Sequence, residues 1–350
     1  DASLDTGVDA GRPTSDKVDL LLMVDNSRSM LEEQASLAMA FPELIRALSL
    51  GDSNGDGEPD FTPLTDMHVG VVTSDMGTAG FTVPTCDVSV GGDDGIMRTT
   101  YGGPSCVTGD PPFLTFNGTG ISGFGTDFAC VAGVGTDGCG LEQQLEAALK
   151  ALTPSSSGVF FVGDGPGHGD RENAGFLRDD SVLVVLVVTD EEDCSVAVPQ
   201  FFSSTTGPYR GVGANIRCTQ DWTEAGAPDP LQPIARYADG FRALKPGRPD
   251  RVVFAALVGI PTDLEGSSFG NILSDARMAY RPDSSMPNQL IPSCDVAGRG
   301  TAYPPRRIVE TAQELDITGS TGLVRSICQE DYSGLVDALL TALAPLLTPA

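Results

Sequence analysis

Residues 18–30 read Val-Asp-Leu-Leu-Leu-Met-Val-Asp-Asn-Ser-Arg-Ser-Met, an apolar run that ends in one carboxylate and two hydroxyls. The run is typical of a strand that is buried on both faces of a parallel sheet. Asp25, Ser27 and Ser29 follow at every second position, so a turn after this strand projects them toward one point. Mg²⁺ and Ca²⁺ prefer such oxygen ligands. The stretch therefore predicts an α/β sheet with a cation site at the end of its first strand.

Asp25 and Ser27 have a second interpretation, because Asp, Asn and Ser also cap helices. Leu31, Ala35, Ala38, Phe41, Ile45 and Leu48 follow at helical spacing over residues 30–48, and we expect Pro42 to kink or restart that helix. A cap would explain the five-residue pattern by itself, whereas its place between a buried strand and a helix favours the cation site.

Alternation of strands and helices predicts the rest of the fold. Continuous apolar runs predict strands at 67–73, 181–189, 251–260 and 322–328, and helical spacing predicts helices at 141–152, 230–244, 306–316 and 332–347. Crossovers of this kind make a doubly wound, mostly parallel sheet with helices on both faces. We expect a flexible leader at 1–16 and one domain at 17–350, with insertions at about 78–138 and 261–305. The first insertion should hold at most short strands.

The charge balance limits the partners of the chain. Its 350 residues carry 21 basic and 48 acidic side chains, a net charge of −27. Such a surface repels nucleic-acid backbones and anionic membranes, and it favours cations or basic partners. No uninterrupted apolar stretch reaches the roughly 18 residues of a spanning helix. We therefore expect neither a nucleic-acid partner nor a transmembrane segment.

The eight cysteines form an even set without a Cys-x-x-Cys pair, which favours disulfides over zinc. Disulfides in turn predict an oxidising, extracytoplasmic compartment. Eight cysteines allow 105 pairings. On short loop closure alone we expect neighbours to pair: Cys86 with Cys106, Cys130 with Cys139, Cys194 with Cys218, and Cys294 with Cys328.

A second acidic strand end lies at residues 189–193, which read Thr-Asp-Glu-Glu-Asp. Ligands of parallel sheets bind outside the carboxyl ends of the strands, and both Asp25 and Asp190 are delivered to that edge. The alternative is that these acidic residues only solvate the end of the strand.

The Asp-x-Ser-x-Ser pattern at 25–29 resembles the metal-ion-dependent adhesion site of von Willebrand factor A domains. The segments 72–77, 188–194 and 322–332 are similar to exported bacterial members of that family. The resemblance implies that a threonine and a second aspartate complete the metal site. Thr136, in the glycine-rich loop 133–140, is the best match for the threonine, and Thr73 is the rival. The implied ligands of Mg²⁺, or of Mn²⁺ or Ca²⁺, are Asp25, Ser27, Ser29, Thr136 and Asp190.

The resemblance implies a divalent-cation-dependent adhesion protein of the bacterial envelope or exterior, secreted, periplasmic or held by a lipid anchor upstream of residue 1. A carboxylate or hydroxyl of a protein or glycan partner would displace a water molecule from the metal, and the last helix, 332–347, would move. Arg28 departs from the family, which has a small residue there; it either shields the site or contacts an acidic ligand.

Two other functions share the same strand edge. The metal could only stabilise a structural envelope module, or a hydrolase could use Asp190, Glu191 or Glu192 as a base. The chain has no phosphate loop or His-Glu-x-x-His motif, and His68 and His168 are its only histidines. We therefore expect a binding protein rather than an enzyme.

Another acidic cluster lies at residues 52–60, with oxygen side chains at every second position and glycines between them. It matches the first half of a calcium loop, but position twelve is Pro63 instead of Glu. A bidentate ligand would have to come from Asp60 or Asp66. The segment predicts either a structural Ca²⁺ site or a solvated turn. The candidate ligands are Asp52, Asn54, Asp56, Glu58 and Asp60.

Overall fold

The computed structural model describes residues 14–52, 54–86, 91–100, 106, 110–162 and 165–349. Six strands form the main sheet in the order β3-β2-β1-β4-β5-β8, and all neighbours are parallel except β2 and β3. The predicted mostly parallel α/β sheet is therefore confirmed. Its strands are β1 Lys17–Val24, β2 Asp66–Thr73, β3 Leu114–Phe116, β4 Val182–Thr189, β5 Val252–Val258 and β8 Thr321–Ser326.

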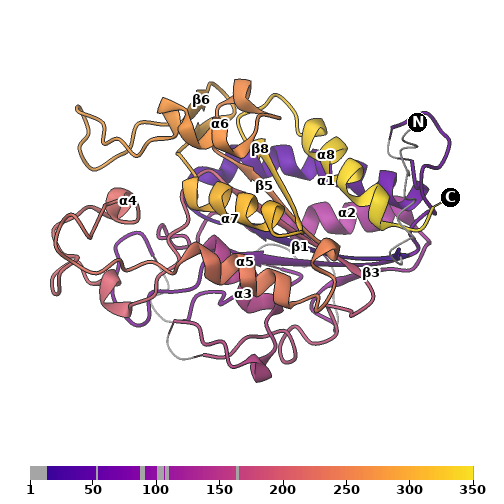
Figure 1. The fold of residues 1–350 in the computed structure, drawn as a ribbon, viewed down its shortest axis with the longest axis horizontal. Helices are drawn as coiled ribbons and strands as arrows, with labels where there is room; N and C mark the ends of the chain where they lie inside the picture. The colour runs from indigo at the N-terminus through magenta and orange to yellow at the C-terminus, as the bar shows by residue number, and fades with distance from the viewer. Residues whose placement is uncertain are drawn as a thin grey trace, which may run out of the picture.

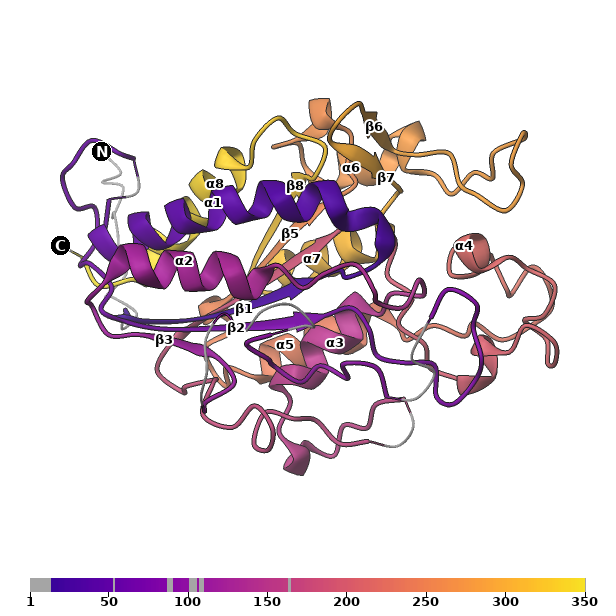
Figure 2. The same cartoon turned by 180° about the vertical axis from the view of Figure 1, so that it is seen from behind.

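Helices cover both faces of this sheet (Figures 1 and 2). Alternate residues of β1 point to opposite sides, so Leu20 and Leu22 pack under one helical layer, and Leu21 and Met23 under the other. The first layer holds α1 Leu31–Leu50, α2 Ile121–Ala132 and α8 Ser333–Leu343. The second holds α3 Gln144–Leu152, α5 Ile234–Ala243 and α7 Arg306–Ile317.

The chain reverses its direction of winding next to β1. It passes from β1 outward to β2 and β3, and then returns to place β4 on the other side of β1. This reversal leaves a crevice at the carboxyl ends of β1 and β4, where ligands of parallel sheets bind. Asp25 and Asp190, the residues that follow these strands, are therefore brought to the same crevice.

The structure excludes a restart of helix α1 at Pro42, and it contradicts the expectation that residues 78–138 hold at most short strands. Helix α1 continues through Pro42 as one element of 20 residues, so the helix does not restart there. Residues 78–138 hold more than short strands, because they include the 12-residue helix α2. Phe128 of α2 stacks on Phe41 of α1 with 4.6 Å between ring centroids, and this packing stabilises a helix of weak intrinsic propensity.

Two excursions of the chain lie over the edge of the sheet opposite the termini (Figures 1 and 2). One spans 191–233, includes the short helix α4 Ala214–Arg217, and encloses a separate apolar cluster around Phe201 and Trp222. The other spans 261–305, with α6 Phe269–Ser274 and the hairpin of β6 Cys294–Val296 and β7 Gly300–Ala302. The second excursion coincides with the insertion expected at 261–305, whereas no insertion was expected at 191–233.

All eight cysteines form disulfides, as expected for an oxidising compartment. The pairs Cys194–Cys218 and Cys294–Cys328 are confirmed. The other two expected pairs are wrong, since Cys86 bonds to Cys139 and Cys106 to Cys130. The reason is tertiary: the main chain of Thr85 accepts a hydrogen bond from Gly140, and this contact holds Cys86 beside Cys139.

Within the described residues, no helix is long and apolar enough to cross a membrane.

Candidate metal centre

Asp25 lies at the centre of the crevice and is fully buried. Its Oδ1 accepts hydrogen bonds from the main-chain N–H of Ser27 (2.7 Å) and the hydroxyl of Ser74 (3.2 Å). Its Oδ2 accepts one from Thr189 Oγ1 (2.6 Å), which in turn accepts from Gln144 Nε2 (2.9 Å). These contacts come from the ends of β1, β2 and β4 and from the start of α3, so the sheet itself orients the carboxylate.

Ser27 and Ser29 lie on the turn between β1 and α1, with 3.1 Å between their hydroxyl oxygens. Thr136 is half-buried, and all three line one cavity of ≈ 340 Å³. The main chain anchors the loop of Thr136, because Gly138 N donates to Asn26 O (2.8 Å). The structure thus brings the three predicted hydroxyls to one cavity. The rival Thr73 instead donates to Asp93 Oδ2 (2.7 Å).

Asp190 is fully buried, and neither of its carboxylate oxygens has a hydrogen-bond partner among the described residues. Burial, and then repulsion from Asp25 and Glu191, raises its pKa well above the usual value. Burial likewise raises the pKa of Asp25, despite the opposing hydrogen bonds from Thr189 and its neighbours. Two carboxylates that are costly to ionise therefore meet at one crevice.

Glu142 and Glu191 extend this group of acidic side chains along the cavity, and both line it. Glu142 is 3% exposed, and its Oε1 has no hydrogen-bond partner among the described residues. Burial and then the charge of Glu191 raise the pKa of Glu142 well above its usual value; burial and then Asp25 raise that of Glu191 to about 7. Glu142 is not among the site residues predicted from the sequence. Its position at the start of an expected helix, just after the glycine-rich loop, was the available signal.

A cation fits this set of side chains. The unpartnered oxygens of Asp190 need a positive partner, and hydroxyl oxygens of Ser27 and Ser29 are suitable ligands of a hard cation. Bound there, Mg²⁺ would offset the repulsion between Asp25 and Asp190. The donors are mainly hydroxyls; within the described ranges, no group of three or more His, Cys, Asp or Glu is arranged to hold a metal.

The acidic loop at 52–60 follows α1, at the other end of that helix from the Ser27–Ser29 turn. Asp52 Oδ1 and Oδ2 accept hydrogen bonds from Gly55 N (2.6 Å) and Gly57 N (3.0 Å). Asn54 and Asp56 likewise each accept one from a main-chain N–H two residues on. Gly57 has a positive φ of 90°, in keeping with the glycine at position six of a calcium loop. Glu58 and Asp60 lie on the same exposed loop, and Ser53 lies outside the described residues.

Glu192 and the two histidines are held by hydrogen bonds. Glu192, a candidate base, accepts from the Tyr280 hydroxyl and from Arg307 N (3.1 Å). His168 lies between Glu172 (2.6 Å) and Asp94 (3.0 Å), and His68 Nδ1 contacts the main-chain oxygen of Phe176 (2.8 Å).

No protein-family model matches the chain, and no curated protein matches its sequence.

Proposed function

We propose that this protein is a divalent-cation-dependent binding protein of the von Willebrand factor A type, exported to the bacterial envelope or exterior. Asp25, Ser27, Ser29, Thr136 and Asp190 would hold Mg²⁺, or Mn²⁺ or Ca²⁺, and a protein or glycan partner would supply a carboxylate or hydroxyl oxygen. The observation that carries this proposal is Asp190, whose buried oxygens have no partner among the described residues.

The surroundings of the metal favour binding over chemistry. Hydroxyls and one or two carboxylates leave an octahedral cation short of ligands, so water completes the shell and a partner oxygen can displace it. Arg28 lines the same cavity, and its exposed guanidinium would attract an acidic group of the partner. The disulfides suit an extracytoplasmic location of such a protein.

Metal binding is the first test of this proposal. Calorimetric titration of Mg²⁺ and Mn²⁺ into the chelator-treated protein should show one site, and Asp25→Asn should weaken it by tenfold or more. Asp239→Asn removes the same charge from a side chain that is 75% exposed and should change nothing. Equal affinity in all three proteins would contradict the proposal.

The binding role needs its own measurement. Capture of envelope or host proteins by the immobilised chain should depend on Mg²⁺ and be lost with chelator or with Asp25→Asn. The same proteins captured under all three conditions would rule out adhesion through the metal.

A structural role is the second candidate, favoured by the burial of Asp25 and Asp190. In that case the metal would only stabilise the fold. Chelation would then lower the melting temperature and leave partner capture intact, whereas adhesion predicts that both fall together.

A further inference from the structure

The cavity at the candidate metal centre continues into an inner recess that none of the implied metal ligands lines. The outer cavity is lined by Ser27, Ser29 and Thr136; the recess, of ≈ 50 Å³, is lined by Gln289 and Tyr303, and Asn215 lines both. The two share a wall that includes Glu142 and Glu191. Together we call them the cleft. Its recess holds the volume of about 3–5 water molecules, which suits one small polar head group.

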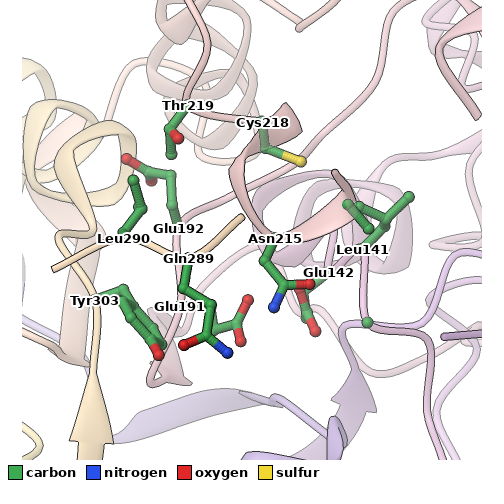
Figure 3. Close-up of a pocket in the computed structure, with 12 residues that line it drawn as sticks. Leu141, Glu142, Glu191, Glu192, Asn215, Cys218, Thr219, Gln289, Leu290 and Tyr303 are labelled. Carbon is green, nitrogen blue, oxygen red and sulfur yellow. The ribbon is translucent and has the colours of Figure 1, made fainter. Parts of the chain in front are cut away.

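Two carboxylates and two side-chain amides meet at this recess. Figure 3 shows the carboxylates of Glu142 and Glu191 and the amides of Asn215 and Gln289 turned toward a common space. Glu142 is only 3% exposed, and its Oε1 has no hydrogen-bond partner among the described residues. A buried carboxylate oxygen of this kind needs a donor or a positive charge. A cation with N–H groups would satisfy it.

The charges of the cleft are also ordered along its length. Arg28 lies in the outer cavity beside the candidate metal ligands, and the two glutamates lie where the outer cavity meets the recess. A bound molecule would therefore meet positive charge, from Arg28 and the metal, at one end and negative charge at the other. Such an arrangement selects for a partner that carries both signs.

We propose that Glu142 and Glu191 bind an ammonium or guanidinium group, so that the partner presents a Lys or Arg side chain close to the acidic side chain that reaches the metal. The partner is then a peptide segment with neighbouring acidic and basic residues. Asn215 and Gln289 would accept further N–H groups through their amide oxygens. This inference rests on the proposed function only for the acidic side chain of the partner, which would bind the metal.

The test uses n-butylammonium and methylguanidinium as probes, with tetramethylammonium, which has no N–H group, as the reference. Titrations are followed by NMR on the 350-residue chain in EDTA. Both probes should bind the wild type in preference to tetramethylammonium, and Glu142→Gln with Glu191→Gln should weaken them by tenfold or more. The control Glu224→Gln with Glu330→Gln changes the net charge equally at exposed sites and should bind as the wild type does.

Each outcome decides the proposal. Equal probe affinity in the wild type, the recess variant and the control would overturn it, because the attraction would then be the net charge alone. A second Mn²⁺ ion that is counted by EPR and lost in the recess variant would also overturn it, by assigning the glutamates to a metal. Gln is isosteric with Glu, and each single variant repeats the measurement should the double variant fail to fold.

The probe titration also separates this inference from the proposed function. Binding of the probes in EDTA and in Asp25→Asn would uphold the recess even where metal-dependent capture fails. Peptides selected from a random display library in Mg²⁺ then test the full ligand. Enrichment of Lys or Arg within three residues of Asp or Glu, lost in the recess variant, is expected. Equal enrichment in both proteins would contradict the proposal.

Discussion

Asp190 shows how a single carboxylate couples the stability of this fold to pH and to metal. Its raised pKa means that the folded protein keeps a proton there at pH values where the unfolded chain has lost it. Between the unfolded and folded pKa values the stability of the metal-free protein therefore falls as pH rises. A bound cation would reverse this loss, because it favours the charged carboxylate.

Asp190→Asn should consequently stabilise the metal-free protein at pH 8, by about 1–3 kcal/mol, the cost of an unsatisfied buried group. The difference should shrink toward pH 4, where the wild-type carboxyl is also neutral. Urea unfolding in EDTA at several pH values measures it. Mg²⁺ should stabilise the wild type and not the variant. A variant that is less stable than the wild type in EDTA at pH 8 would contradict this reading of the site.

At the scale of elements, His168 joins two segments that lie beside α3. Its ring lies between Glu172 and Asp94, and Asp94 also accepts from Lys150 of α3 (2.5 Å). Burial opposes the charge on His168, but the hydrogen bonds from its ring to Asp94 and Glu172 outweigh it and raise its pKa above 6.5. The stabilisation is therefore fully present below pH 6.5 and is lost as pH rises through the folded pKa.

His168→Gln should cost about 1.5–3 kcal/mol at pH 5.5, the usual value of hydrogen bonds to charged groups. Its cost should be smaller at pH 9, where the wild-type ring is neutral. Denaturant unfolding at the two pH values gives the comparison, with Asp239→Asn as an exposed control. The same loss at both pH values would show that the ring contributes packing rather than charge.

Elements were predictable where local pattern and tertiary role agree. The apolar run of β4 predicts a central strand. Every residue of that strand is buried in the structure, as the prediction requires. Helix α2 was missed because its glycines, serine and threonine are typical of loops. Phe124, Phe128 and Val131 nevertheless recur at spacings of four and three and are buried in the core shared with α1.

The candidate site likewise has a part that the sequence predicts and a part that depends on tertiary structure. Asp25 and Asp190 could be placed together from sequence because strand order alone brings the ends of β1 and β4 to one edge. Ser74 and Thr189, which contact Asp25, and Glu142 were not identified, since their roles depend on how loops from three strands meet. Nor did any local pattern reveal that the excursion 191–233 covers the cleft with Asn215.

At the scale of the whole molecule, three disulfides bind excursions to the edge of the sheet that carries the candidate site. Cys86–Cys139 joins the segment after β2 to the loop before α3. Cys194–Cys218 joins the end of β4 to α4, and Cys294–Cys328 joins β6 to the segment after β8. Cys106–Cys130 instead attaches to α2, on one face of the sheet. The positions of these excursions, which form the rim of the cleft, therefore depend on disulfides more than the apolar sheet does.

Two disulfides allow a matched comparison, because Cys106–Cys130 and Cys194–Cys218 both span a sequence separation of 24. Loop-closure entropy gives each about 3 kcal/mol of stabilisation, so the two double Cys→Ser variants should lose similar stability in urea. Only the loss of Cys194–Cys218 should free the segment that carries Asn215 and weaken binding of Mg²⁺ and of methylguanidinium. Hydrogen exchange should rise at 196–226 in that variant, while β1, β4 and β5 stay protected. Equal loss of ligand binding in both variants would mean that binding in the cleft depends on the overall stability of the protein and not on the Cys194–Cys218 link.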